Sequence, residues 1–172
     1  MKKFIYIFTM LFAVVFSACN SEDFDYDIEY TPIHPMGGQY RVSIVDETGA
    51  TVSLSSSKYC YISNTAANDT DKCWIRIGDY NESKSKEYAI NGKIACDVNS
   101  LTFSGTAMNL AGNVASSNEN FTVTNGKIEL KGATAPSGTV CDKISFTFTR
   151  DNYPGKTYTV TGYRYTGWTE TD

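Results

Sequence analysis

Few residues of this chain have the types and spacing that catalysis requires. A serine nucleophile needs a positioned base, normally a histidine, and the one histidine, His34, lies in a proline-rich segment. No G-x-S-x-G motif occurs. Glycosidase chemistry needs two carboxylates across a cleft, and the sequence selects no pair among Asp97, Glu129, Asp142 and Asp151. We therefore identify no catalytic residue, and enzymatic activity is not the main hypothesis.

Metal and cofactor chemistry have no clear basis either. A single histidine excludes a histidine-rich metal site, and the cysteines lack the short spacing of a zinc site. The oxygen-rich turns at 68–71 and 79–82 lack the spacing of a calcium loop. We expect solvated turns at both places, no bound metal and no cofactor.

Aromatic residues are the more useful signal for ligand binding. Phe, Tyr and Trp make up 13% of the chain, and many fall in strand-like segments. Most are expected to pack in a core, but rings can also line a ligand cavity or form a platform on which sugars stack. We predict a ligand-contacting set of Trp74, Tyr88, Tyr163, Arg164 and Trp168.

Arg164 has two possible orientations. Counting by twos from Tyr158 and Val160 puts it on the inward face, where a buried guanidinium needs a carboxylate partner or an anionic head group. A bulge at Gly162 would instead turn Tyr163 inward and leave Arg164 in water. The sequence leaves both orientations open.

The N-terminus has the pattern of a bacterial lipoprotein signal. Lys2 and Lys3 precede an apolar block at 4–16, and the small residues at 17 and 18 precede Cys19. The block is shorter than the roughly 20 residues of a membrane-spanning helix. We expect residues 1–18 to be removed and Cys19 to be lipidated; an ordinary secretory signal is the alternative.

The predicted location is the bacterial cell envelope, as an outer-membrane lipoprotein, with surface exposure as one option. Residues 19–36 form an acidic tether. Removing Lys2 and Lys3 changes the net charge from -4 to -6, which gives no electrostatic reason to bind nucleic acid. The membrane contact is expected to be the lipid rather than a basic patch, and envelope proteins are possible partners.

Four cysteines remain, and all lie in strand-like segments: Cys60, Cys73, Cys96 and Cys141. An oxidising envelope would permit two disulfides in three pairings. A buried free thiol behaves as a small hydrophobe, and a domain of this size does not need disulfides. We expect buried free cysteines, with at most one bridge.

The fold prediction rests on period-two alternation between short turns. Strands are expected at 39–45, 59–63, 73–77, 87–98, 101–106, 120–124, 127–132, around 144–148 and at 157–168. Asn125-Gly126 predicts a hairpin turn, whereas Asn91-Gly92 is interpreted as a kink within one strand. Residues 37–172 are therefore predicted to be one all-β domain, an antiparallel up-and-down barrel of about eight strands; a β-sandwich is the alternative.

Three stretches resemble a known family of bacterial lipoproteins: 32–40 (PIHPMGGQY), 62–68 (ISNTAAN) with Trp74-Ile75, and 162–168 (GYRYTGW). The family is described as lipid-binding putative hydrolases with a lipocalin-like barrel. The resemblance covers nearly all of the chain after the signal. It implies a barrel that binds a lipid, and it carries over no catalytic residue.

Three functional hypotheses follow. The first is a lipid-anchored binding protein that holds a small apolar or amphipathic ligand in its barrel, which would need an apolar cavity of about 300 Å3 or more. The second is a non-catalytic accessory lipoprotein with a filled barrel and an exposed aromatic patch. The third is a weak hydrolase, as the family description implies.

Overall fold

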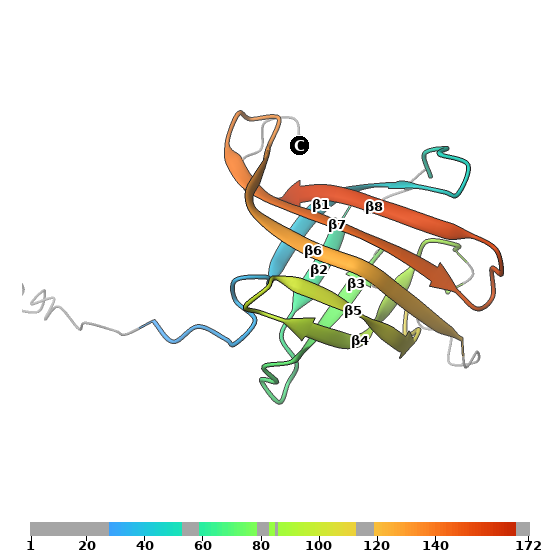
Figure 1. Cartoon of the computed structure of the whole chain (residues 1–172), viewed down its shortest axis with the longest axis horizontal. Helices are drawn as coiled ribbons and strands as arrows, with labels where there is room; N and C mark the ends of the chain where they lie inside the picture. Colours follow the sequence, from blue (N-terminus) through green and yellow to red (C-terminus); the bar gives the residue numbers. More distant parts are fainter. Residues whose placement is uncertain (1–27, 53–58, 79–82, 85, 113–118, 168–172) are drawn as a thin grey trace, which may run out of the picture.

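The computed structural model describes residues 28–52, 59–78, 83–84, 86–112 and 119–167, and these form eight strands (Figure 1). The strands are β1 Gly38–Val45, β2 Tyr59–Ser63, β3 Lys72–Ile77, β4 Ile90–Asp97, β5 Thr102–Met108, β6 Asn120–Thr134, β7 Val140–Arg150 and β8 Thr157–Arg164.

All eight strands belong to one closed antiparallel barrel, in chain order. Each strand pairs with the next, and β8 closes on β1 in an unbroken register from Tyr40 opposite Arg164 to Val45 opposite Thr159. Closure leaves no exposed sheet edge. The predicted up-and-down, lipocalin-like barrel is confirmed, and the alternative β-sandwich is not formed.

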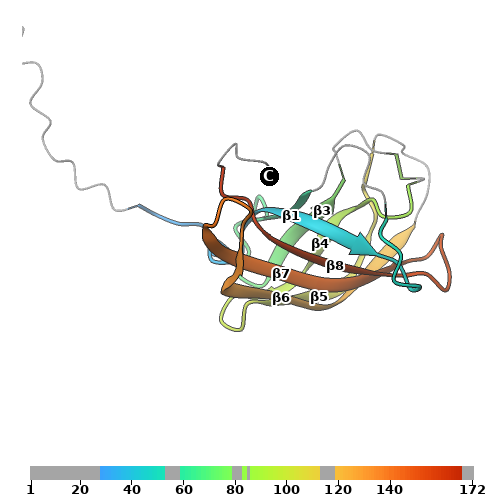
Figure 2. The same ribbon diagram turned by 90° about the horizontal axis from the view of Figure 1, so that it is seen from above.

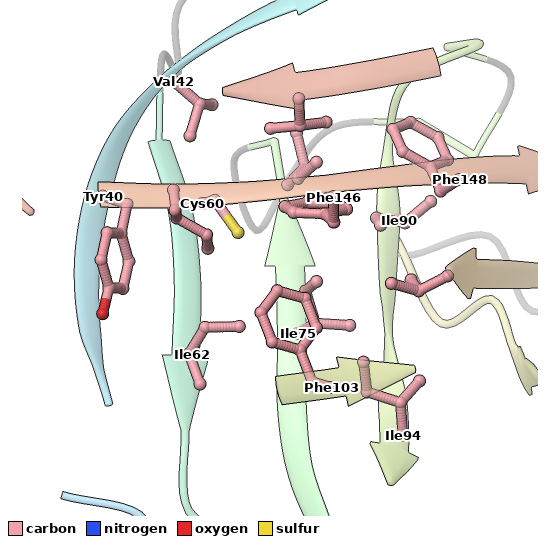
Figure 3. Packing of buried hydrophobic residues seen from close by; sticks show 14 of the residues in the cluster. Tyr40, Val42, Cys60, Ile62, Ile75, Ile90, Ile94, Phe103, Phe146 and Phe148 are labelled. Carbon is pink, nitrogen blue, oxygen red and sulfur yellow. The ribbon is translucent and has the colours of Figure 1, made fainter. Parts of the chain in front are cut away.

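The interior of the barrel is filled by its own side chains (Figure 3). Alternate residues of β7 point inward, and Ile144, Phe146 and Phe148 are at most 2% exposed. The ring of Phe148 stacks on Tyr158 at a centroid distance of 4.9 Å. Side chains this completely covered leave no water-sized void beside them. The lumen that could have held a ligand is thus occupied by the core.

The hairpin predicted at Asn125-Gly126 is wrong, because β6 runs through both residues without turning back. The pairing of β6 with β7 shifts between Thr124 and Lys127, and Asn125 has φ 54°. A Cβ on Gly126 would lie 2.2 Å from the carbonyl oxygen of Phe103, so only glycine fits there. The Asn-Gly pair therefore makes a β-bulge within a 15-residue strand rather than a turn.

The interpretation of Asn91-Gly92 as part of one strand is confirmed. Both residues lie inside β4, which begins at Ile90 rather than at residue 87. Asn91 pairs with Arg76 and Gly92 with Ile75, so the ladder to β3 continues through the glycine. Regular pairing on both sides of an Asn-Gly pair therefore overrides its preference for turns.

We call the end of the barrel where β1 begins and β8 ends the tether end, and the opposite end the far end. Figure 2 shows the described residues that precede β1, from residue 28 on, at the tether end of the barrel. Just before β1, a turn ties the amide of Met36 to the carbonyl of Ile33 at 2.9 Å. Ile33 and Met36 are 1% and 0% exposed. The last residues of the predicted tether thus pack as part of the core.

Within the described parts of the chain, no helical segment has the length and hydropathy that a membrane crossing requires.

Candidate functional site

The outward side chains differ between the two halves of the barrel. We call those of β1–β4 the β1–β4 wall and those of β5–β8 the threonine wall. The threonine wall carries a row of four threonines in register across its strands: Thr106, Thr122, Thr149 and Thr157. The β1–β4 wall instead carries aromatic rings and basic side chains.

An open hollow of about 590 Å3 lies on the β1–β4 wall. This volume is within the usual range of small-molecule sites. Its lining combines aromatic and aliphatic surface with one guanidinium and one amide: Gly38, Tyr61, Ile62, Ser63, Trp74, Arg76 and Asn91. The hollow is therefore amphipathic, because apolar surface lies beside the polar side chains of Ser63, Arg76 and Asn91.

Strand register assembles this hollow. Tyr61 of β2 lies directly opposite Arg76 of β3, and Arg76 lies opposite Asn91 of β4. The guanidinium carbon of Arg76 is 4.3 Å from the centroid of the Tyr61 ring, which is a cation–π contact. The ring fixes the guanidinium while leaving N–H donors available for a ligand.

At the tether end, the Arg164 side chain points inward and contacts β1, β7 and the turn before β1. Its Nε donates to Asp142 Oδ2 at 2.9 Å, and its Nη1 donates to the Gly37 carbonyl at 2.5 Å. Its Nη2 donates to the Pro35 carbonyl and the Tyr40 hydroxyl, at 3.1 and 3.0 Å. Arg164 therefore fastens the turn before β1 to the barrel.

The inward orientation of Arg164 has two structural causes. The register between β8 and both of its neighbours contains no bulge at Gly162, so the alternation continues from Val160. A Cβ on Gly38, whose φ is 151°, would come within 2.8 Å of Arg164 Nη1, so glycine makes room for the guanidinium. Asp142 supplies the carboxylate partner that an inward arginine was expected to need. Burial raises the pKa of Tyr40, and the charge of Arg164 opposes that increase.

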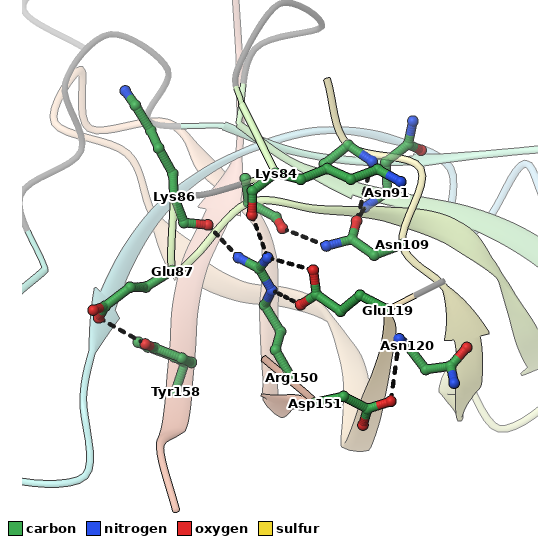
Figure 4. A network of polar contacts seen from close by, with 12 residues as sticks. Lys84, Lys86, Glu87, Asn91, Asn109, Glu119, Asn120, Arg150, Asp151 and Tyr158 are labelled. Carbon is green, nitrogen blue, oxygen red and sulfur yellow. Dashed lines mark hydrogen bonds and ion pairs between the residues drawn. The ribbon is translucent and has the colours of Figure 1, made fainter. Parts of the chain in front are cut away.

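At the far end, Arg150 forms a more deeply buried cluster (Figure 4). Its Nε and Nη2 contact the two carboxylate oxygens of Glu119 at 2.5 and 2.8 Å. Its Nη1 and Nη2 also donate to the carbonyls of Lys86 and Lys84. Both side chains of the ion pair are 0% exposed. Arg150 thus joins β7 to the segments that precede β4 and β6.

Two further contacts complete the far end. Buried Asn109 donates from Nδ2 to the Ala89 carbonyl at 3.0 Å and accepts from the Asn91 amide at 3.1 Å. Glu87 accepts from Lys156 Nζ at 2.8 Å and from the Tyr158 hydroxyl at 2.9 Å. These contacts hold the connections at this end in place.

The four cysteines after residue 19 are buried free thiols, as expected from the sequence. Burial raises the thiol pKa of Cys60, Cys73 and Cys96. A raised pKa keeps the thiol protonated and poor as a nucleophile. These three cysteines therefore behave as core residues.

The predicted ligand set is not brought together in one place. Trp74 lies in the hollow of the β1–β4 wall, and Tyr163 lies on the outside of β8, opposite Arg41 and Lys143. Tyr88 is buried just before β4 at the far end, and Arg164 is inward at the tether end. Trp168 and the predicted lipidation site, Cys19, lie outside the described residues.

The histidine and the carboxylates considered for hydrolysis all contact other protein groups. The His34 ring packs on Tyr30 at a centroid distance of 4.0 Å. The four candidate carboxylates lie at different places and each has protein partners: Asp97 with Ser100, Glu129 with Lys127 and Lys143, Asp142 with Arg164, and Asp151 with the amide of Asn120. Within the described residues, no cluster of three or more His, Cys, Asp or Glu side chains suits a metal ion.

Two arrangements escaped the sequence reasoning: the pair of Arg150 with Glu119, and the stack of Arg76 on Tyr61. Counting by twos from Phe148 puts Arg150 inward, and the same counting from Trp74 puts Arg76 outward. The sequence therefore indicates which face of its strand each arginine occupies. It does not identify Glu119 or Tyr61 as their partners, because those contacts depend on the three-dimensional arrangement of the strands and connections.

This fold and site define a class of protein: an eight-stranded antiparallel barrel with a filled core and an amphipathic hollow on its outer wall. Residues 25–169 match the model of a family described as "lipid-binding putative hydrolase". The chain belongs to this family, which is the one that its sequence resembles.

Other comparisons add little. None of the curated proteins compared with the chain matches it. A similar solved structure is a structural-genomics protein of unknown function from Bacteroides ovatus, with 14% identity and a TM-score of 0.44. The similarity covers 74% of this chain and 41% of the other.

Proposed function

We propose that this chain is a lipid-anchored, non-catalytic binding protein of the bacterial cell envelope. Its ligand is amphipathic and occupies the hollow on the β1–β4 wall rather than the lumen. Family membership supports a lipid as the ligand. The buried core supports an outer site, because the inward side chains of the described strands pack into one hydrophobic cluster in the lumen. The anchor is Cys19, which follows the signal-like segment.

The observation that carries this proposal is the composition of the hollow. Trp74 and Tyr61 offer apolar surface, and Arg76 lies between Tyr61 and Asn91 in the strand register. Among the described ion pairs, none uses Arg76. A half-buried guanidinium that lines the hollow without a described carboxylate partner favours an anionic group on the ligand.

The accessory-lipoprotein hypothesis also has a specific observation in its favour. That hypothesis expects a filled barrel and an exposed aromatic patch; the clustered core and the half-buried rings of Tyr59 and Tyr61 on the outer wall support it in part. In that function the β1–β4 wall would contact an envelope protein or a glycan instead of a single lipid. The two functions differ in whether a monomeric amphiphile binds in the hollow.

Tryptophan fluorescence separates these functions. The chain has two tryptophans, so Trp168→Phe leaves Trp74 as the only reporter. In a Cys19→Ser background, an anionic lysophospholipid below its micellar concentration should shift Trp74 emission to the blue, with saturation. Arg76→Gln should weaken binding by about tenfold, equivalent to about 1.4 kcal/mol.

Lys127→Gln is the matched control, because Lys127 lies outside the hollow on β6. It should leave the lysophospholipid affinity unchanged. An emission spectrum that does not respond to any lysophospholipid, in a folded protein, would exclude the ligand site and favour the accessory function.

A further inference from the structure

The β1–β4 wall concentrates positive charge on an acidic protein. Its outward positions include four cations, Arg41, Lys72, Arg76 and Lys93, and a single carboxylate, Asp97. The whole chain has a formal net charge of -4. The strand register therefore gathers basic residues that the sequence distributes over more than 50 positions.

Three of these cations lie over aromatic rings instead of carboxylates. The cation-to-centroid distances are 5.9 Å for Arg41 over Tyr59, 4.3 Å for Arg76 over Tyr61, and 6.0 Å for Lys93 over Trp74. Among the described ion pairs, none involves Arg41, Arg76 or Lys93. The wall thus presents three positive charges that described carboxylates do not neutralise.

The rings on the wall lie close together and extend to Tyr165, which follows β8. Tyr59 lies 6.2 Å from Tyr61 and 5.7 Å from Tyr165, measured between centroids. The Arg76 guanidinium covers a face of the Tyr61 ring, which removes a surface on which a sugar would stack. This arrangement favours recognition of anionic groups over recognition of neutral glycans.

We propose that the β1–β4 wall docks on the surface of a bilayer that contains anionic lipid. Tyrosine and tryptophan are enriched where proteins meet the membrane–water interface, and lysine and arginine are attracted to anionic head groups. Neighbouring strands are separated by about 4.8 Å, so the cations on the paired strands β3 and β4 can meet several head groups at once. The contact adds a second membrane signal to a single lipidated residue.

The position of the wall agrees with this partner. Gly38, where the N-terminal segment joins β1, lines the hollow, and the Tyr165 amide donates to the Gln39 carbonyl at 2.8 Å beside it. The threonine wall has fewer such cations: of Lys127, Lys131 and Lys143, two pair with Glu129, at 3.8 Å for Lys127 and 3.7 Å for Lys143, and only Lys131 has no partner among the described ion pairs. Docking therefore orients the barrel with the β1–β4 wall against the lipid.

Vesicle co-sedimentation tests this contact without the lipid anchor. The probe protein is the chain from position 19 onward with Cys19→Ser, and the vesicles are phosphatidylcholine with or without phosphatidylglycerol. We expect binding only to the anionic vesicles, with affinity that falls as salt rises. The double variant Arg76→Gln/Lys93→Gln should bind about 10- to 50-fold more weakly.

Lys127→Gln/Lys143→Gln is the matched control, because it changes the net charge by the same amount on the threonine wall. It should retain the affinity for vesicles, and circular dichroism checks that both variants are folded. Equal loss in both double variants would overturn the proposal, as would equal binding to neutral vesicles. Binding to an acidic polysaccharide but not to anionic vesicles would also overturn it.

This inference does not require the hollow to be occupied. Vesicle binding without a Trp74 response to monomeric lysophospholipid would support docking and exclude the ligand site. The reverse pattern would support the ligand site and exclude docking.

Discussion

Both ends of the barrel contain an arginine that points inward and pairs with a carboxylate, but they bury these groups differently. At the far end, the side chains of Arg150 and Glu119 are both 0% exposed. At the tether end, Arg164 and Asp142 are 29% and 18% exposed. Arg150 binds two carbonyls of the segment before β4, and Arg164 binds two carbonyls of the segment before β1.

This difference in burial implies different roles: the Arg150–Glu119 pair is part of the core, whereas the Arg164–Asp142 pair holds one local segment against the barrel. An uncompensated charge in a fully buried position is costly, so losing only one partner at the far end should destabilise the whole barrel. Water reaches the tether end and can solvate either partner after the other is lost. Arg164 therefore controls a local segment, and Arg150 affects the whole fold.

Removing one partner at the far end should have the largest effect. Arg150→Ala leaves Glu119 buried without a counterion, and we expect the free energy of unfolding to fall by about 3–5 kcal/mol. Urea denaturation measures this loss. The double variant Arg150→Met/Glu119→Leu removes both charges and should recover most of the stability. A double variant as unstable as Arg150→Ala would show that cavity formation, and not the charge, causes the loss.

At the tether end, Arg164→Gln should cost less, about 1–2 kcal/mol, because the site is partly solvated. The effect should be local: the amides of Met36 and Gly37, both bonded to the Ile33 carbonyl, should exchange with deuterium faster. Amides in the middle of β7 should keep their protection. Uniform acceleration throughout the barrel would contradict the contrast between the ends.

Gly38→Ala tests whether glycine makes room for Arg164. The new Cβ would approach Arg164 Nη1, and φ at this position is 151°, so we expect a loss of about 1 kcal/mol. The same substitution in an Arg164→Gln background should cost less, because the clash has been removed. A double-mutant cycle of denaturation midpoints measures this coupling. Additive effects would assign the cost to the backbone alone.

Glu87 gives the far end a small dependence on pH. The hydrogen bond from Lys156, and secondly that from Tyr158, lowers the pKa of Glu87 below its ordinary value of 4.5. Because the folded pKa is the lower one, Glu87 stabilises the fold above the unfolded pKa. This contribution is lost as pH falls through the folded pKa.

Glu87→Gln should therefore make stability less sensitive to acid below about pH 4.5. Lys156→Gln should remove much of the same sensitivity, since Lys156 is the largest cause of the lowered pKa. Thermal unfolding between neutral and acidic pH measures both variants. An unchanged pH profile in Glu87→Gln would show that the contact with Lys156 does not affect stability.

The sequence predicted the barrel well because alternation and burial follow the same physics. Ile144, Phe146 and Phe148 alternate because only one face of a barrel strand meets the core. The error at Asn125-Gly126 has an equally physical cause. A tight hairpin turn and some β-bulges both favour an Asn-Gly pair, because both use residues with a positive φ, so the dipeptide alone does not distinguish them.

The candidate site was harder to predict, because it depends on which outward residues become neighbours. Tyr61 and Arg76 are separated by 15 positions in sequence, and one shift of register would part them. The basic patch of the β1–β4 wall was missed for the same reason. The net charge of the sequence shows only that the whole chain is acidic. It does not show that strand pairing places several cations together on the β1–β4 wall.

The pairing of β1 with β8 makes the strand order of the barrel circular. Linking the ends of the chain and reopening it at the β7–β8 turn, where Gly155 is exposed, would preserve all eight strand neighbours. Such a circular permutant would carry its termini at the far end. The same barrel could then be attached to a surface through its far end. The position of the chain termini, and not the strand order, therefore determines which end of the barrel faces that surface.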